Sequence, residues 1–362
     1  MTKKMMVLLA LPFLWTVLPA QQMDTARIGQ VVRQAVKLVD RNLPQEAIRS
    51  WDEAISLRPD FAPYKYERAI CLVMLKQYKQ AAEALQPIYR MPELFDRGYQ
   101  LIGNCYDFMD DTAEARGFYR EGLVAWPKSG RLHYELGNSA YAASDQQGAL
   151  DYWIKGTIVE PSFATNYYQV CVTFANTPYR FWAILYGELF LNLERATQRT
   201  AEISQLLFKT WSASISPGTG DPINLASDDL LNEPNKNDAS SMSFPMAFEY
   251  TTATSVVAAH IKGPLSALNI EQLVEIRTKF IEAWKAAGYL QKYPNDLLSF
   301  HAALLDSGWL NEYLWWLCSY GNTDDMKKYY KENEQRYDTF LGWFGEHSIS
   351  FEKQLCVGYH CP

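Results

Sequence analysis

The residue types that most often carry catalytic or metal chemistry are scarce or scattered in this chain. Its 362 residues include five histidines, and none of them has the two-histidine spacing of a zinc-hydrolase helix. There is no G-x-S-x-G nucleophile elbow, and Gly218-Thr-Gly220 lacks the Lys-Ser/Thr pair that completes a phosphate-binding loop. We therefore expect a non-catalytic protein that needs neither a metal nor an organic cofactor.

Basic residues do not form a cluster either. The 34 Lys and Arg residues are outnumbered by 41 Asp and Glu residues, which gives a net charge of -7, and no Lys/Arg-rich run occurs. A nucleic-acid-binding protein normally carries such a run or patch, so we expect no nucleic-acid partner. With 48% hydrophobic and 21% charged residues, the chain is unlike both a disordered protein and a many-pass membrane protein.

The first twenty residues have the pattern of a secretory signal peptide. Lys3 and Lys4 form a short basic segment, an apolar run from Met5 to Leu18 follows, and Ala20 places a small residue before the expected cut. The run is shorter than the roughly 20 apolar residues of a membrane-spanning helix. We expect cleavage near Ala20, a periplasmic or secreted protein, and no stable membrane insertion of the mature chain.

A repeat with a period of 34 residues runs through the first half of the sequence. Five small residues recur at this spacing, and each is preceded by another small residue 12 positions earlier. In the first four copies a bulky residue follows four positions later, and a proline follows after 11 or 12 positions. The recurring residues are Ala47, Ala81, Ala115, Ala149 and Ala183; the preceding ones are Ala35, Ala69, Gly103, Gly137 and Cys171; the bulky ones are Trp51, Leu85, Tyr119 and Trp153.

This spacing predicts helical hairpins. A small residue on the first helix lets the second helix approach closely, and the bulky residue four positions after the alanine lies on the same helix face. Proline ends the second helix because it has no amide proton to continue the hydrogen-bond ladder. One hairpin cannot cover its own apolar face, so neighbouring hairpins are expected to stack into a right-handed solenoid.

The third copy carries the pattern most completely, with Tyr99, Gly103, Ala115 and Pro127 at recurring places. With the period of 34, these residues resemble the tetratricopeptide repeat family. The resemblance covers about residues 28–196 and implies a concave groove lined by the first helix of each hairpin, at its second, fifth, ninth and twelfth places.

The groove places are apolar in the first copy and polar or aromatic in the middle copies. Asn104 and Asn138 lie one repeat apart, where an amide can hydrogen-bond the backbone of a peptide, and Arg97 and Arg131 repeat likewise and could hold a carboxylate. The set resembles in part the carboxylate clamp of chaperone-binding members of the family. It lacks basic residues at the clamp's other places, Gln100 among them, so a generic peptide groove is predicted instead. The candidate groove residues are Tyr66, Arg97, Gln100, Asn104, Arg131, Tyr134, Asn138, Tyr141 and Tyr168.

A second interpretation of these residues is purely structural. The tyrosines would cover a hydrophobic seam, and the arginines would pair with nearby acids. The spacing alone does not separate the two.

The second half of the chain is predicted to be helical but less regular, so the fold class is all-α. We expect a solenoid over 21–196, a capping helix over 197–213, a loop, linker or lid over 214–245, and a C-terminal helical domain over 246–362. Residues 307–340 are compatible with a degenerate sixth hairpin, with Leu314, Met326 and Tyr330 at its small and aromatic places. Within the C-terminal domain, helices are expected at 246–262, 269–287, 294–306, 309–319 and 324–337.

The leading hypothesis is an interaction scaffold or adaptor that binds a protein or peptide segment in the groove. One alternative is a glycan- or nutrient-binding protein that uses the aromatic residues of 309–344, and another is a hydrolase with its site in the C-terminal half. Cys356 and Cys361 are close enough in sequence to form a disulfide in an oxidising compartment. The remaining cysteines discussed, expected to be small buried side chains, are Cys71, Cys105 and Cys171.

Overall fold

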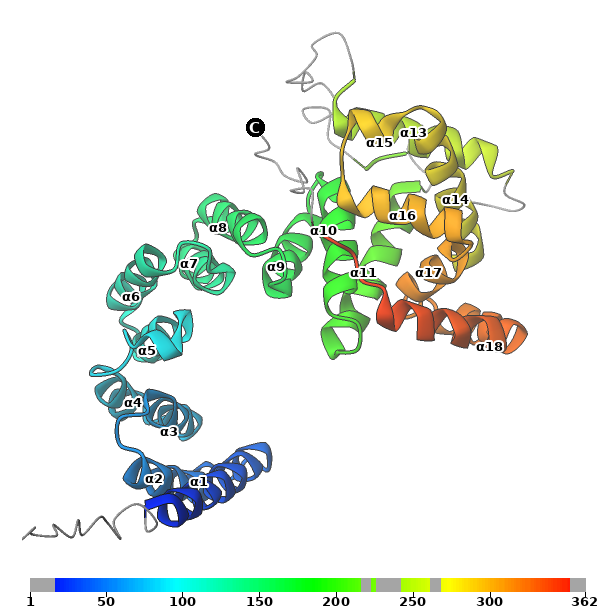
Figure 1. Ribbon diagram of the computed structural model, residues 1–362. Coiled ribbons are helices and arrows are strands. Elements are labelled where there is room, and N and C mark those ends of the chain that lie inside the picture. The colour runs from blue at the N-terminus through cyan, green and yellow to red at the C-terminus, as the bar shows by residue number, and fades with distance from the viewer. Residues whose placement is uncertain (1–16, 216–222, 226–241, 261–267, 352–362) are drawn as a thin grey trace, which may run out of the picture. The chain divides into compact units, whose positions relative to one another are not determined.

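Helices are the only regular elements in the described part of the chain, which confirms the all-α prediction (Figure 1). The computed structural model describes residues 17–215, 223–225, 242–260 and 268–351. The chain divides into two compact units, Met1–Pro127 and Lys128–Pro362. Each unit is described by itself.

The first unit consists of three helical hairpins in which helices that follow each other in sequence pack together. A short 3-10 turn, η1 (Pro92–Leu94), precedes the third hairpin. Helix α1 runs through the cut expected near Ala20. The three hairpins are α1 (Val17–Asp40) with α2 (Pro44–Leu57), α3 (Ala62–Met74) with α4 (Tyr78–Leu85), and α5 (Asp96–Asp107) with α6 (Thr112–Ala125).

The second unit begins with two more hairpins and continues into the C-terminal helices. The predicted capping helix is α11 (Gln198–Ile215), which packs against α9 and α10. Helices are present at the five expected C-terminal places. The first ends at Ala258, and residues 261–262 of its expected span lie outside the described part; the last continues past 337 with a kink at Asn333. The other helices are α7 (Gly130–Ala142), α8 (Gln146–Val159), α9 (Ala164–Ala175), α10 (Arg180–Leu193), α13 (Phe244–Ala258), α14 (Ile270–Ala286), α15 (Tyr289–Lys292), α16 (Asp296–Ser307), α17 (Leu310–Leu317) and α18 (Thr323–Glu346).

The contacts between small and bulky residues confirm why the hairpins form. A Cβ atom added to Gly103 would lie 2.2 Å from Cε1 of the Tyr119 ring, and one added to Gly137 would lie 2.2 Å from Nε1 of Trp153. In the fifth copy the glycine is on the second helix instead, where a Cβ atom on Gly187 would lie 2.8 Å from Cys171 Sγ. In these three hairpins, therefore, one small residue lets the two helices approach closely.

The turns inside the hairpins repeat as well. Asn42, Lys76, Asp110 and Ser144 follow each other at 34-residue intervals, and all four adopt left-handed backbone conformations, with φ between 57° and 63°. In each case the next amide bonds a carbonyl five residues back, as from Asp111 N to the carbonyl of Tyr106 at 2.9 Å. This is the Schellman geometry that ends a helix.

Residues on both sides of position 196 share one hydrophobic core, although the sequence analysis placed a domain boundary there. The core cluster of the second unit extends from Ala140 to Ile349. Helix α10 connects the two parts because 12 of its 14 residues are buried, with α9 on one side and α16 on the other (Figure 1). A helix that is apolar on all faces is covered on all faces.

Several other expectations concern single residues of the chain. Cys71, Cys105 and Cys171 are buried and unpaired, as expected. The register proposed for a sixth hairpin is not seen, since Tyr330 at its aromatic place is exposed while Tyr329 is buried. Most of the expected 214–245 loop, and the possible disulfide between Cys356 and Cys361, lie outside the described residues.

Candidate peptide-binding face

The candidates of the first unit lie on α3 and α5, the first helices of their hairpins. Arg97 is exposed, whereas Tyr66, Gln100 and Asn104 are half-buried. Arg97 also acts on Glu67: burial raises the pKa of that carboxyl group, and the guanidinium charge partly offsets the rise. The charge of Arg97 therefore acts on an acid of the neighbouring first helix.

Asn104 is held by its own hairpin. Its Oδ1 atom and Oδ2 of Asp107 both lie 2.7 Å from the hydroxyl of Tyr119. One phenol hydroxyl donates a single hydrogen, so one of the two partners must donate in return; a rotated Asn104 amide or a protonated Asp107 would do so. Burial raises the pKa of Asp107, and the Tyr119 bond partly opposes that rise. Asn104 is therefore engaged in the hairpin, which leaves less of its amide for a peptide.

Asn138 occupies the same repeat place in the second unit with a different environment. The residue at the place of Tyr119 is Trp153, whose Nε1 donates to the carbonyl of Tyr134 at 3.3 Å. An indole ring has no acceptor to offer an amide. Within the described ranges the half-buried Asn138 side chain has no hydrogen-bond partner, so it can still donate and accept.

Tyr141 lies three residues after Asn138 and shares its helix face. It is 58% exposed, and its ring centroid lies 6.0 Å from that of Trp153. Toward the start of α7, the Arg131 guanidinium lies 5.4 Å from the centre of the Phe163 ring, and Tyr134 meets the same ring edge-on. The face of α7 is therefore polar and aromatic along its length.

Tyr168 on α9 is tied to α11. Its hydroxyl donates to Glu202 at 3.1 Å, and the Arg199 guanidinium lies 5.2 Å from its ring centre. Counting on by the 34-residue period, α11 begins where a sixth first helix would begin, and Arg199, Glu202, Leu206 and Lys209 take its second, fifth, ninth and twelfth places. Helix α11 therefore extends the row of first helices formed by α7 and α9.

In the described C-terminal part, two tryptophan rings stack on a neighbouring ring. A cleft of about 650 Å³ lies between α14, α17 and α18, and Trp315 and Tyr329 line it. These two rings stack on each other, with centroids 4.1 Å apart and planes at 8°, and Trp343 stacks in the same way on His347. Each of these rings therefore has one face covered by a neighbouring ring.

A histidine and a carboxylate meet in the core of the second unit. Arg277 donates to Glu188 through two bonds of 2.6 and 3.1 Å, and His301 Nε2 lies 3.3 Å from Glu188 Oε2. All three side chains are at most 3% exposed, so a substrate has no access to them. Burial alone would raise the pKa of Glu188, but Arg277 and His301 bring it down to about 2. Burial lowers the pKa of His301, so this histidine is neutral near pH 7.

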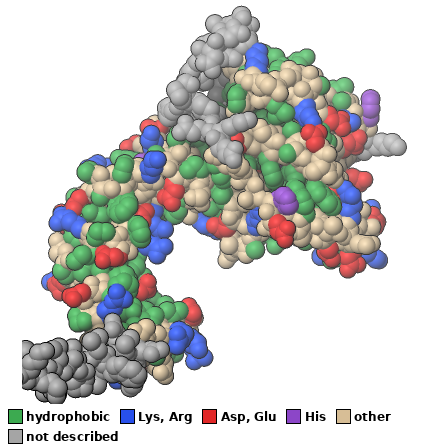
Figure 2. Space-filling model, viewed as in Figure 1, with side chains coloured by type: hydrophobic (Ala, Val, Ile, Leu, Met, Phe, Trp, Pro, Cys, Tyr) green, Lys and Arg blue, Asp and Glu red, His purple; other side chains and the backbone are tan. Residues whose placement is uncertain are grey.

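No group of three or more His, Cys, Asp or Glu side chains in the described ranges could hold a metal ion. None of the helices described is both long and apolar enough to span a membrane. On the face shown in Figure 2, side chains of both charge signs are mixed over the surface of each unit.

Comparison with known proteins identifies the hairpins. The tetratricopeptide repeat family model matches residues 32–91. These residues are tetratricopeptide repeats. The hairpins that follow continue the same 34-residue period and the same contacts between small and bulky residues.

Solved structures of tetratricopeptide repeat proteins also match the chain. MamA from Desulfovibrio magneticus RS-1, from residue 41 to its end, is 16% identical over 48% of this chain and 97% of its own, with a TM-score of 0.36. YrrB, described as a tetratricopeptide repeat protein with an unusual peptide-binding site, is 16% identical over 47% of this chain and 87% of its own, with a TM-score of 0.32. No curated protein matches the chain.

Two polar groupings of the second unit were not predicted from the sequence. One is the buried set of Glu188, Arg277 and His301; the other is a pair of cations, Arg180 and Lys209, that line a cavity beside α11. Glu188 had a visible signal, since it is the one charged residue inside the apolar run Phe181–Leu193. The cations had no comparable signal, because their cavity depends on segments far apart in sequence.

Proposed function

We propose that this protein is a non-catalytic scaffold whose repeat hairpins bind an extended segment of a protein partner. The observation that carries the proposal is the face of α7, where the unpartnered amide of Asn138 lies beside the exposed ring of Tyr141. An amide can bond a peptide backbone as donor and acceptor, and a tyrosine ring supplies apolar contact with little loss of side-chain entropy.

The repeat supports an extended ligand rather than a compact one. Neighbouring first helices pack about 10 Å apart, and an extended chain advances about 3.3 Å per residue, so one helix corresponds to about three ligand residues. A linear segment thus meets equivalent places on successive helices at regular intervals. In the second unit, α7, α9 and α11 offer three such helices.

The test compares two variants of the mature chain in pull-downs from periplasmic extract, with recovered proteins quantified by mass spectrometry. Asn138→Ala/Tyr141→Ala removes the proposed contacts, and Gln147→Ala/Lys155→Ala changes two exposed residues of α8 as a matched control. We expect partners recovered by the wild type and the control to fall at least about tenfold with the first variant. Equal recovery of every partner by all three proteins would refute the proposal that Asn138 and Tyr141 bind the partner.

We also propose export to the periplasm, based on the signal-like pattern of residues 1–20. Expression of the full chain in a Gram-negative host, followed by osmotic shock and N-terminal sequencing, tests this. Protein that is released by osmotic shock and begins at Gln21 supports the proposal, and full-length protein retained in the cytosol contradicts it.

A further inference from the structure

The turn between α9 and α10 departs from the repeat. Counting by 34, Pro178 takes the place of the left-handed residues Asn42, Lys76, Asp110 and Ser144. Proline fixes φ near −65°, so this turn cannot adopt the same conformation. Instead, Thr177 Oγ1 donates to the carbonyl of Phe174 at 2.8 Å and accepts from the amide of Tyr179 at 3.1 Å.

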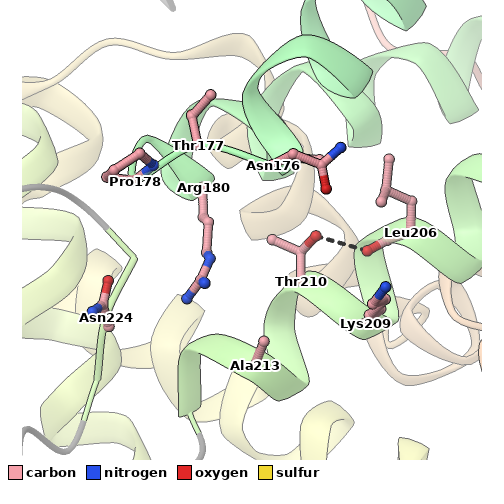
Figure 3. Close-up of a pocket in the computed structure, with 10 residues that line it drawn as sticks. Asn176, Thr177, Pro178, Arg180, Leu206, Lys209, Thr210, Ala213 and Asn224 are labelled. Carbon is pink, nitrogen blue, oxygen red and sulfur yellow. Dashed lines mark hydrogen bonds between the residues drawn. The ribbon is translucent and has the colours of Figure 1, made fainter. Parts of the chain in front are cut away.

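A cavity of about 500 Å³ opens beside this turn (Figure 3). It is bounded by the end of α9, the turn, the start of α10, helix α11 and Asn224. Two backbone hydrogen bonds hold the segment that contains Asn224. Asn224 N donates to the carbonyl of Ser214 at 2.9 Å, and Phe181 N donates to the carbonyl of Leu225 at 2.7 Å. The volume lies within the range of small-molecule sites and far exceeds that of a bare inorganic ion.

Among the described residues that line the cavity, the charge is of one sign. Arg180 and Lys209 are the ionisable members of this described lining, and both are cationic. Across the described residues neither has an ion-pair or hydrogen-bond partner. Figure 3 shows the Arg180 side chain extending into the cavity between Asn224 and the α11 residues Thr210 and Ala213.

The other lining groups suit an organic molecule. Asn176 and Asn224 contribute amides, whereas the Thr210 hydroxyl is already used in a 2.8 Å bond to the carbonyl of Leu206. Leu206 and Ala213 add apolar surface. A planar guanidinium matches the two oxygens of a carboxylate or phosphate, and an ammonium group nearby adds a second charge.

We propose that this cavity binds a small organic anion, with Arg180 holding its carboxylate or phosphate group and Lys209 supplying the second positive charge. The amides bond the polar groups of the ligand, and its apolar part lies against Leu206 and Ala213. The site is formed within the second unit, and two of its lining residues, Leu206 and Lys209, also take the ninth and twelfth groove places of α11.

Titration calorimetry on the mature chain tests the proposal. The probes are citrate for the carboxylate class, adenosine 5′-monophosphate for the phosphate class, inorganic phosphate as a bare oxyanion, and adenosine as a neutral control. We expect citrate or the nucleotide to bind with a Kd of about 1 mM or tighter at low ionic strength, more tightly than inorganic phosphate. The neutral control should not bind.

The variants locate the binding. Arg180→Gln should weaken it at least about tenfold, because a charge-assisted two-bond contact is lost. Lys209→Gln should weaken it by about threefold or more, and by less at high salt, because a single flexible charge is lost. Lys155→Gln/Lys331→Gln removes two exposed cations elsewhere in the same unit and should leave the affinity unchanged.

Arg180→Lys keeps the positive charge but lacks the planar guanidinium that bonds two oxygens at once. It serves as a second variant if circular dichroism shows that Arg180→Gln does not fold. Asn138→Ala/Tyr141→Ala should bind the anion as the wild type does, which separates anion binding from the proposed peptide contacts of α7. No binding of either organic probe at about 10 mM, or binding that survives Arg180→Gln and Arg180→Lys, would overturn the proposal. An equal loss in the Lys155→Gln/Lys331→Gln control would also overturn it.

Discussion

Replacing Glu188 with glutamine should destabilise the second unit strongly. The Glu188 side chain is 1% exposed and that of Arg277 3% exposed, and the two are joined by bonds of 2.6 and 3.1 Å. Glutamine is nearly isosteric with glutamate but neutral, so it leaves the Arg277 cation uncompensated in the core. Breaking a buried pair in this way costs about 3–5 kcal/mol. That is a large part of the 5–15 kcal/mol typical of a whole domain.

Urea unfolding followed by circular dichroism measures the effect. With a slope of about 1–3 kcal/mol per molar urea, the midpoint should fall by at least about 1 M. Glu282→Gln is the matched control, because Glu282 pairs with Lys279 at 2.9 Å on the exposed surface of the same unit. Such pairs contribute about 0–1 kcal/mol.

Hydrogen exchange gives a local readout of the same change. The amides of α10 and α14 should lose protection in the Glu188→Gln protein and keep it in the control. Since replacing both charges with apolar residues removes the uncompensated cation, Glu188→Met/Arg277→Met should be more stable than Glu188→Gln. A Glu188→Gln protein that unfolds like the Glu282→Gln control would refute the reasoning.

Four further substitutions test the repeat and the core. Gly137→Ala should lower the unfolding free energy by about 1–3 kcal/mol, because its Cβ atom would lie 2.2 Å from the Trp153 ring. Gly117→Ala is the control: no atom lies within 4 Å of the added Cβ, so this substitution should raise the unfolding free energy by up to about 1 kcal/mol. Lys76→Gly should raise the Tm, since relief of the left-handed strain at φ 59° outweighs the added chain entropy by about 0.5–1 kcal/mol; a lower Tm would contradict this. For His301→Gln, the free energy of unfolding should depend less on pH than in the wild type between about pH 7.5 and 5.5. Burial lowers the pKa of His301 from 6.5, so in this range the unfolded chain binds a proton that the folded chain does not. The wild type therefore loses stability as the pH falls, and the variant lacks this contribution. Equal pH slopes of the urea midpoints in the two proteins would be evidence against it.

The repeat could be predicted from the sequence because its determinants are local and periodic. Gly103 and Tyr119 are 16 positions apart, and this offset recurs in every hairpin. The helices, their turns and the closing contacts all follow from that one offset. The fifth copy keeps the same offset between Cys171 and Gly187, although here the glycine is on the second helix and the larger residue is on the first.

The candidate groove was harder to predict, because a side chain's availability depends on its neighbours. Asn104 and Asn138 are equivalent in sequence, but Tyr119 engages the first and Trp153 leaves the second without a partner. Tyr168 is likewise bound to Glu202 on α11. The period of 34 places these residues correctly and does not say which of them are free.

The anion site and the buried pair were not predictable from periodicity at all. Asn176 and Asn224 line one cavity although 48 positions separate them, and Glu188 and Arg277 are 89 positions apart. Such contacts require the tertiary packing of non-repeating helices. The sequence indicates only that a polar contact is needed, as where Glu188 is the one charged residue inside the apolar run Phe181–Leu193.

Both features originate in the fifth copy, where the turn between the two helices departs from the repeat. Pro178 prevents the left-handed turn of the earlier copies, and the altered turn lines the cavity that Arg180 enters. Eight residues after Arg180, Glu188 faces the C-terminal helices, which therefore must supply a cation as well as apolar surface. A repeat array needs a cap for its last apolar face. Here 12 of the 14 residues of α10 are buried, so the cap is a folded set of helices rather than one polar helix, and the Glu188–Arg277 pair joins α10 to α14 within it.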